Sequence, residues 1–243
     1  PPPPATTTKL AAGTDHTCGL RSDGVAKCWG ANGKGQLGDG TNVGHPTASN
    51  VPGLSGIADI AAGDQFTCAV DTGGAVWCWG DNDYRQLGTG DNVASSTPVT
   101  VRGVSGAVAV TAGTQHACAV TTSGTVWCWG GNGVGQLGAG PGSPLTAVAA
   151  TGLDDARTVS AGNLHTCALR ASGGLACWGS NFAGRLGDGT TTNRNTPTPV
   201  AGLDNVDSVG VGGNHSCAIE RDGGAWCWGS NLTGQLGDGT TTN

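Results

Sequence analysis

Residues 66–80 read FTCAVDTGGAVWCWG, and the pattern returns as HTCGLRSDGVAKCWG at 16–30, HACAVTTSGTVWCWG at 116–130, HTCALRASGGLACWG at 165–179 and HSCAIERDGGAWCWG at 215–229. Successive copies lie 49 or 50 residues apart. A fixed period of this size is typical of one supersecondary unit that is used repeatedly, as in propellers and solenoids. The sequence therefore predicts a repeat protein rather than a globule with a single core.

Each copy is predicted to be a β-hairpin whose two cysteines face each other. The triplet at the middle of the hairpin ends in glycine in all five copies, as in Ser22-Asp23-Gly24. A three-residue hairpin loop places its last residue in the left-handed region, which glycine adopts without steric cost. Counting outward from this loop puts Cys18 opposite Cys28 in a non-hydrogen-bonded pair, where Cα atoms are about 4.5 Å apart. A disulfide can span that distance.

The ten cysteines thus predict five disulfides, each within its own hairpin: Cys18–Cys28, Cys68–Cys78, Cys118–Cys128, Cys167–Cys177 and Cys217–Cys227. Zinc binding is one alternative, but zinc ligands usually come as a C-x2-C pair, and these pairs lack that spacing. Buried free thiols are the other alternative. Because disulfides are typical of oxidising compartments, we expect a secreted or cell-surface protein.

Composition narrows the classes of partner. The net charge is −6, only 12% of the residues are charged, and the lysines and arginines are scattered singly. This pattern lacks the basic face that nucleic acids require. The chain also lacks an apolar run long enough to cross a membrane. We interpret it as a mature segment whose signal peptide has been removed. We expect no cofactor and no metal.

The second copy illustrates the expected blade. Strands are predicted at 57–63, 66–70, 75–79 and 97–101, and the glycine-rich loop before the last strand places Leu87 between blades. Four strands make one propeller blade. The predicted fold is all-β, either a β-propeller or an open propeller-like arc of about five four-stranded blades.

Three strings in the first copy carry a family resemblance: AAGTDHTCGL from Ala11, CWG at 28–30 and GQLGDG at 35–40. They resemble the repeat of the regulator of chromosome condensation (RCC) family, in particular its secreted, disulfide-containing bacterial-type members. The resemblance covers all but about the first eight residues. It implies a propeller, usually seven-bladed, that serves nucleotide exchange on a small GTPase, chromatin docking or, in secreted relatives, protein binding and inhibition. The cysteine pairs and the acidic charge depart from the nuclear members.

Comparison between copies also tests candidate catalytic and metal sites. Four copies have histidine at one position (His16, His116, His165 and His215), but the second copy has Phe66 there, which favours packing. Asp39, Asp188 and Asp238 occupy Leu-Gly-Asp-Gly turns, where Thr89 and Ala139 replace them elsewhere, so these turns do not require calcium. No catalytic arrangement stands out from the repeat, and we expect a protein that is not an enzyme.

Tryptophans fall into two sets. One is present in every copy and is predicted to pack between blades: Trp29, Trp79, Trp129, Trp178 and Trp228. The other comprises Trp77, Trp127 and Trp226, whose position is Lys27 or Ala176 in the remaining copies. A position that tolerates lysine is predicted to be partly exposed. These three indoles are a candidate binding surface for carbohydrate or protein, and packing beneath a neighbouring loop is the alternative.

The ends of the chain complete the prediction. Residues 1–8 (Pro1, Pro2, Pro3, Pro4, Ala5, Thr6, Thr7 and Thr8) form a Pro/Thr-rich segment, and 9–243 form the five-repeat domain. The fifth copy has three predicted strands and lacks the fourth. We therefore expect 1–8 to supply the outer strand of a fifth-copy blade, in another subunit rather than in its own; a flexible linker is the alternative.

Three functional hypotheses follow from these observations. The first is an extracellular structural protein that associates head to tail with copies of itself, as a filament if the contact does not close. The second is a secreted protein-binding or inhibitor propeller. The third, against which the cysteine pairs and acidic charge argue, is a guanine-nucleotide exchange factor. A chain that is a fragment of a longer protein is a further possibility.

Overall fold

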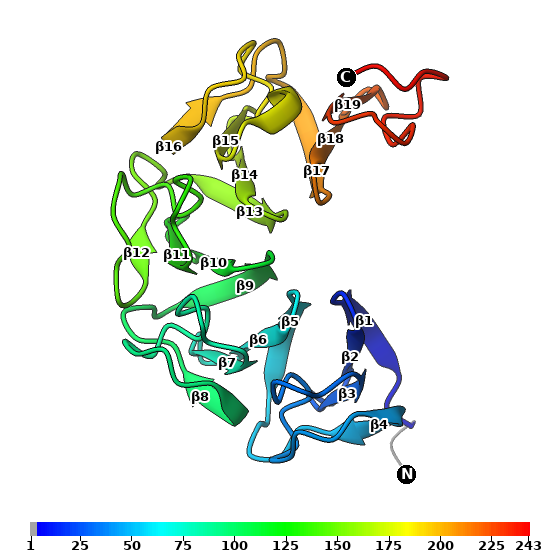
Figure 1. Cartoon of the computed structure of the whole chain (residues 1–243), viewed down its shortest axis with the longest axis vertical. Helices are drawn as coiled ribbons and strands as arrows, with labels where there is room; N and C mark the ends of the chain where they lie inside the picture. The colour runs from blue at the N-terminus through cyan, green and yellow to red at the C-terminus, as the bar shows by residue number, and fades with distance from the viewer. Residues whose placement is uncertain (1–3) are drawn as a thin grey trace.

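In the computed structural model, which describes residues 4–243, five antiparallel sheets follow one another around an open arc (Figure 1). The first four sheets have four strands each, and the fifth has three strands among the described residues. The opening of the arc separates the first sheet from the fifth (Figure 1). The predicted all-β fold of repeated blades is confirmed, including the three-stranded fifth copy.

The strands keep the same order in every blade. The innermost strands are β1 (Thr7–Ala12), β5 (Ile57–Ala62), β9 (Ala107–Ala112), β13 (Ala156–Ala161) and β17 (Val206–Val211). The second strands are β2 (His16–Arg21), β6 (Phe66–Asp71), β10 (His116–Thr121), β14 (His165–Arg170) and β18 (His215–Glu220). The third strands are β3 (Ala26–Gly30), β7 (Val76–Gly80), β11 (Val126–Gly130), β15 (Leu175–Gly179) and β19 (Ala225–Gly229). The outer strands are β4 (His45–Asn50), β8 (Ser95–Thr100), β12 (Val148–Ala149) and β16 (Arg194–Pro199).

Helical structure is minimal. Among residues 4–243 the helical segment is the single 3-10 turn η1 (Phe182–Gly184). The described part of the chain contains no helix with the length and apolarity needed to cross a membrane.

The hairpins carry the five predicted disulfides. In the first blade Cys18 pairs with Cys28 in the strand register, and the equivalent cysteines pair in the other four blades. The Cα atoms of each pair are 4.1 Å apart. Gly24 closes the first hairpin with φ +75°, in the left-handed region expected of it.

The disulfides of the first four blades each face the next blade along the chain. Cys18 and Cys28 belong to one buried cluster with Ile60 and Trp79 of the second blade, and Leu37 of the first long loop lies in the same cluster. Equivalent clusters fill the next three interfaces. Leu87 is fully buried in one of them, as predicted. The buried apolar side chains therefore gather between neighbouring blades, as expected of a repeat protein.

The N-terminal segment differs from its prediction. β1 begins at Thr7, so Thr7 and Thr8 belong to the innermost strand of the first blade, and Thr7 pairs with Arg21. Pro1, Pro2 and Pro3 lie outside the described residues.

The register explains why the outer-strand prediction is wrong for Thr7 and Thr8. Six residues connect every outer strand to the next innermost strand, namely 51–56, 101–106, 150–155 and 200–205. The Thr6 carbonyl accepts a hydrogen bond from Ser22 N at 2.8 Å, just as the Gly106 carbonyl, at the last position of a connector, accepts one from Thr122 N. Residues 4–6 therefore match a connector and not an outer strand.

Candidate functional site

Two loops of every blade meet at one end of the sheets. One is the short turn between the first and second strands, and the other is the long loop after the third strand. In the first blade they are joined by a hydrogen bond from Ala31 N to the Asp15 carbonyl at 2.8 Å, and every blade has its equivalent. We call this end the loop face, and the long loops are 31–44, 81–94, 131–147, 180–193 and 230–243. The hairpin loops lie at the opposite end of the sheets.

A buried asparagine holds each long loop in shape. Asn82 is fully buried, and its Oδ1 accepts a hydrogen bond from Leu87 N at 2.9 Å. Its Nδ2 donates to the carbonyls of Asp91 and Val93. The same arrangement recurs at Asn32, Asn132, Asn181 and Asn231. The loop face is thus preorganised by its own side chains.

The aspartates of the Leu-Gly-Asp-Gly turns also accept hydrogen bonds from nearby residues. Asp188 Oδ1 accepts hydrogen bonds from the backbone and hydroxyl of Thr190, and its Oδ2 accepts one from Arg194 Nε at 2.7 Å. Burial opposes ionisation of Asp188, but these hydrogen bonds, with one from Asn181, lower its pKa to about 2. Among the described residues no group of three or more His, Cys, Asp or Glu side chains is arranged to hold a metal ion.

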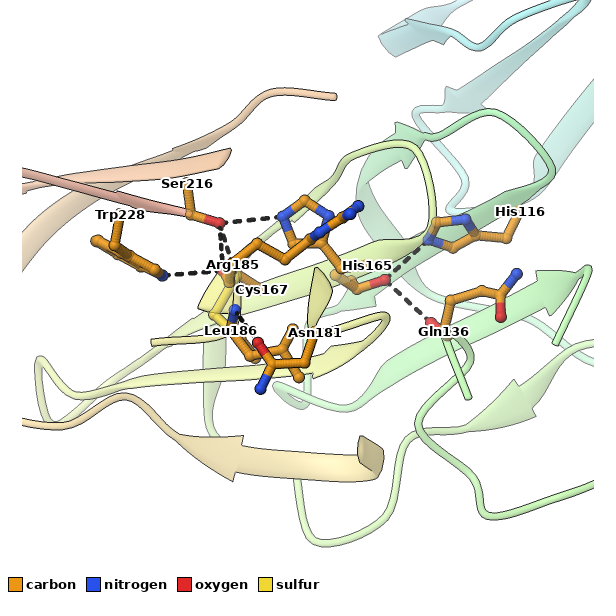
Figure 2. The surroundings of a disulfide bond; sticks show 11 residues. His116, Gln136, His165, Cys167, Asn181, Arg185, Leu186, Ser216 and Trp228 are labelled. Carbon is orange, nitrogen blue, oxygen red and sulfur yellow. Dashed lines mark hydrogen bonds between the residues drawn. A yellow bond between two sulfur atoms is a disulfide. The ribbon is translucent and has the colours of Figure 1, made fainter. Parts of the chain in front are cut away.

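Three of the four repeated histidines, His16, His116 and His165, join neighbouring blades (Figure 2). His165 Nε2 lies 3.0 Å from Ser216 Oγ of the fifth blade. Ser216 Oγ donates its own proton to the Arg185 carbonyl, which also accepts a hydrogen bond from Trp228 Nε1. Because the serine proton is already used, His165 donates from Nε2. The same relay joins the first blade to the second and the third to the fourth.

Burial keeps these rings neutral. Desolvation lowers the pKa of His116 to about 4 and that of His165 to about 3. A neutral, fully buried imidazole that donates to a hydroxyl is a structural group, which supports the packing interpretation and adds a hydrogen bond to it.

Sequence reasoning missed the partner hydroxyl, although a signal for it exists. The one interface with Phe66 in place of histidine has Ala117 in place of the hydroxyl residue, and both are fully buried. The other interfaces pair His16 with Thr67, His116 with Thr166 and His165 with Ser216. Comparing each histidine with the residue 50 or 51 positions later would have found this match.

The two sets of tryptophans differ in burial. Of the five tryptophans predicted to pack between blades, Trp79, Trp129 and Trp178 are fully buried. Trp228 is partly buried against the last interface, and Trp29 of the first blade is only partly buried. Trp77 and Trp127 are half-buried against the interface clusters, whereas Trp226 is 55% exposed and donates to Glu220 Oε2. These three candidate indoles lie in three separate blades, on β7, β11 and β19, and the structure does not bring them together into one patch.

Comparison with known proteins agrees with this architecture. Residues 4–243 match the model of the RCC1-like domain. The chain belongs to this family. A comparison with curated proteins found no match.

Two solved structures are similar to this RCC1-like chain. Human WBSCR16 is 21% identical, with a TM-score of 0.86 over 98% of this chain and 65% of its own. Prp20p from Saccharomyces cerevisiae is 24% identical, with a TM-score of 0.84 over 97% of this chain and 61% of its own. The chain therefore spans less than two thirds of either neighbour.

Two of the RCC1-like neighbours are described with partners. Prp20p is described with its binding properties to Gsp1p and histones. A further structure, yeast RCC1 (Prp20) bound to Kap60, is 25% identical, with a TM-score of 0.79 over 91% of this chain and 55% of its own.

Proposed function

We propose that this RCC1-like chain is a non-enzymatic, extracellular interaction protein that binds protein partners on its loop face. The five hairpin disulfides support an oxidising, extracellular location. The partners of yeast Prp20 support protein binding as the general role of such a scaffold.

The distribution of exposed apolar side chains carries the proposal. Among residues 4–243, six of the ten large hydrophobic residues that are exposed belong to the long loops: Val43, Tyr84, Val93, Leu145, Phe182 and Leu232. Tyr84 is 50%, Phe182 58% and Leu232 66% exposed. Single exposed hydrophobic residues are ordinary, but protein interfaces draw their energy from a few apolar or aromatic anchors within a polar surround. Because the buried asparagines already fix the loops, little ordering is needed on binding.

Substitutions on the loop face, compared with substitutions on the hairpin loops at the opposite end, test this proposal. We expect the variant Tyr84→Ala/Phe182→Ala/Leu232→Ala to lose partner binding while keeping its unfolding midpoint. The matched control, Thr72→Ala/Ser123→Ala/Ser172→Ala, changes three hairpin loops at the opposite end. Immobilised wild-type and control chains should retain the same partner from the secreted proteins of the source organism. Equal retention by all three chains, or by none, would contradict the proposal.

Association with further copies is a second candidate, favoured by the two end blades. Leu10 of the first blade is 63% exposed, whereas its equivalent Ile60 is fully buried. Ile219 of the fifth blade is 49% exposed, whereas its equivalent Leu169 is 1% exposed. Both faces border the opening of the arc between the first and fifth blades (Figure 1). Contact between copies would use these faces.

Sedimentation tests this second candidate. Association predicts species heavier than the 23.7 kDa chain, which Leu10→Asp or Ile219→Asp should reduce to a monomer. Val43→Asp, on a long loop, is the matched control. A wild-type chain that sediments only as a monomer contradicts association.

A further inference from the structure

Arg85 breaks the repeat on the loop face. Its backbone has φ +67°, in the left-handed region, and the other four copies have glycine at this place: Gly35, Gly135, Gly184 and Gly234. A non-glycine residue rarely takes this conformation. Such an outlier, at a position that the other four copies fill with glycine, suggests that the side chain is retained for a function.

The neighbouring blade explains why this copy accommodates a side chain that would clash in the first and third copies. At Gly135 an added Cβ would lie 2.6 Å from the Asn195 Cα of the next outer strand, β16. The third blade has no such strand opposite Arg85, because its outer strand β12 is reduced to two residues. The chain instead passes through Gly-Pro-Gly-Ser-Pro at 140–144 in a repeat that is one residue shorter. Two departures from the repeat, in adjacent blades, thus occur at one place.

Together they open a groove of about 330 Å³ between the second and third blades. Tyr84, Arg85 and Asn92 come from one long loop, and Ser143 comes from the next. The lining is completed by Asp83, Gln115, Asn132 and a row of glycines (Gly130, Gly131 and Gly133). The groove therefore combines a half-exposed phenol ring with amide, hydroxyl and guanidinium groups and with glycine backbone that a ligand can approach closely.

Arg85 is the one cationic side chain in the lining of the groove, and neither of its hydrogen-bond acceptors is a carboxylate. Arg85 Nε donates to Asn92 Oδ1 at 3.3 Å, and a terminal nitrogen donates to the Ser143 carbonyl at 3.2 Å. Both acceptors are neutral, so they orient the guanidinium without neutralising it.

The one carboxylate in the lining is already paired. Asp83 Oδ2 lies 2.9 Å from Lys34 Nζ, which also contacts Asp81. Arg85 forms no ion pair with any described residue, and arginine binds carboxylates through its fork of N–H donors. The Arg85 guanidinium is therefore available to bind an anionic group in this groove.

We propose that the groove binds a carboxylate of a partner protein, with Arg85 as the charged contact and Tyr84 as the adjacent aromatic contact. Tyrosine and arginine side by side are the residue types that most often dominate binding energy at protein interfaces. The inference rests on the proposed function, because it names the chemistry of the partner that the loop face would bind.

Titration of the ¹⁵N-labelled chain with small carboxylate probes tests the inference. N-acetylglutamate N-methylamide presents a side-chain carboxylate, N-acetylalanine presents a C-terminal one, and N-acetylglutamine N-methylamide is the uncharged control. We expect at least one carboxylate to shift the Arg85 Nε–H signal and the amides of Gly131 and Gly133. The glutamine probe should bind at least about tenfold more weakly. The stronger of the two carboxylates identifies the type that the partner offers.

Two variants complete the test. Arg85→Gly restores the residue of the other four copies and should fold, yet it should abolish these shifts. Arg102→Gln removes an arginine that does not line the groove and should leave them unchanged. No shift with either carboxylate, equal binding of the glutamine probe, or binding that survives Arg85→Gly overturns the inference.

The outcome for this groove is separable from the outcome for the loop face as a whole. If partner retention requires Tyr84, Phe182 and Leu232 but is unaffected by Arg85→Gly, carboxylate recognition is wrong and the proposed function stands. If carboxylates bind but no protein partner is retained, the groove stands and the proposed function is wrong.

Discussion

His116 Nε2 lies 2.8 Å from the Thr166 hydroxyl, and this contact joins the third blade to the fourth. Thr166 donates its own proton to the Gln136 carbonyl at 3.0 Å, so the imidazole is the donor in the pair. Both residues are fully buried. Their contact is therefore a hydrogen bond formed without competition from water, and it fixes how two disulfide-closed blades sit against each other.

Replacing His116 alone should destabilise the chain. His116→Phe removes the donor and brings a larger ring against the Thr166 side chain, and we expect a loss of about 1–2 kcal/mol in the free energy of unfolding. His116→Phe/Thr166→Ala recreates the Phe66 and Ala117 pair of the neighbouring interface and should recover about half or more of that loss. Urea unfolding of the wild type, both single variants and the double variant measures the coupling. Strictly additive effects would show that the two side chains act independently.

The stability of the chain should fall between pH 6.5 and pH 4. The ordinary histidine pKa is 6.5, and burial lowers the pKa of His16 and His116 to about 4 in the folded protein. The unfolded chain therefore binds protons below pH 6.5 that the folded chain excludes. The free energy of unfolding is therefore highest above pH 6.5. It declines as the pH falls, by up to about 1.4 kcal/mol per pH unit for each histidine.

Unfolding free energies at pH 7 and pH 5 test this dependence. The variant His116→Phe/Thr166→Ala removes one titrating group, so its loss of stability over this range should be smaller than that of the wild type. Asp188 titrates in a separate pH range. Its pKa is lowered to about 2 in the folded protein, so its contribution to stability is lost only as the pH falls below about 4. Equal losses for the wild type and the variant would contradict the assignment to His116.

Much of the fold was predictable because five copies of one sequence pattern define the strands and their register better than a single copy would. Five triplets ending in glycine define the hairpin register, and the register places Cys18 opposite Cys28. The strands predicted for the second copy match β5, β6, β7 and β8 within two residues. The outer-strand role of Thr7 and Thr8 was mispredicted because proline content was given more weight than spacing, although six-residue connectors set the position of every innermost strand.

The candidate site was less predictable, since it depends on contacts between blades. Trp77, Trp127 and Trp226 share a repeat position, yet Trp226 alone is more exposed than buried, because no further blade or outer strand covers β19 among the described residues. The groove at Arg85 arises from a substitution in one copy and a shortened strand in the next. Comparison of equivalent positions, which predicts the scaffold well, does not detect a feature built from two different copies.

The disulfides should differ in their resistance to reduction. The four pairs of the first four blades are fully buried beneath the next blade, as Cys68 and Cys78 are. In the fifth blade Cys227 is exposed and Cys217 is half-buried. Thiolate attack requires access to a sulfur atom. Mild reduction of the native chain followed by alkylation should therefore label Cys217 and Cys227 first.

Peptide mapping measures how fast each cysteine is labelled, and the other eight cysteines serve as internal controls. Alkylation without reduction should label none of the ten, because every cysteine is paired. Labelling of Cys68 or Cys118 at the same rate as Cys227 would contradict the protective role of the blade interfaces.

Adding a side chain at Gly135 should destabilise the chain, whereas removing the side chain of Arg85 should not. Gly135 has φ +86°, and a Cβ added there would lie 2.2 Å from Asn195 Oδ1 and 2.6 Å from Asn195 Cα. The second contact is with backbone, so Gly135→Ala requires the outer strand β16 to move, and we expect a loss of about 1–3 kcal/mol. Arg85→Gly removes a left-handed side chain where glycine has no steric penalty, and it should change the free energy of unfolding by less than about 1 kcal/mol in either direction. Thermal and urea unfolding of both variants beside the wild type compare the two sites directly. A larger loss for Arg85→Gly than for Gly135→Ala would mean that Arg85 supports the fold through Asn92 and Ser143 and is not kept for binding.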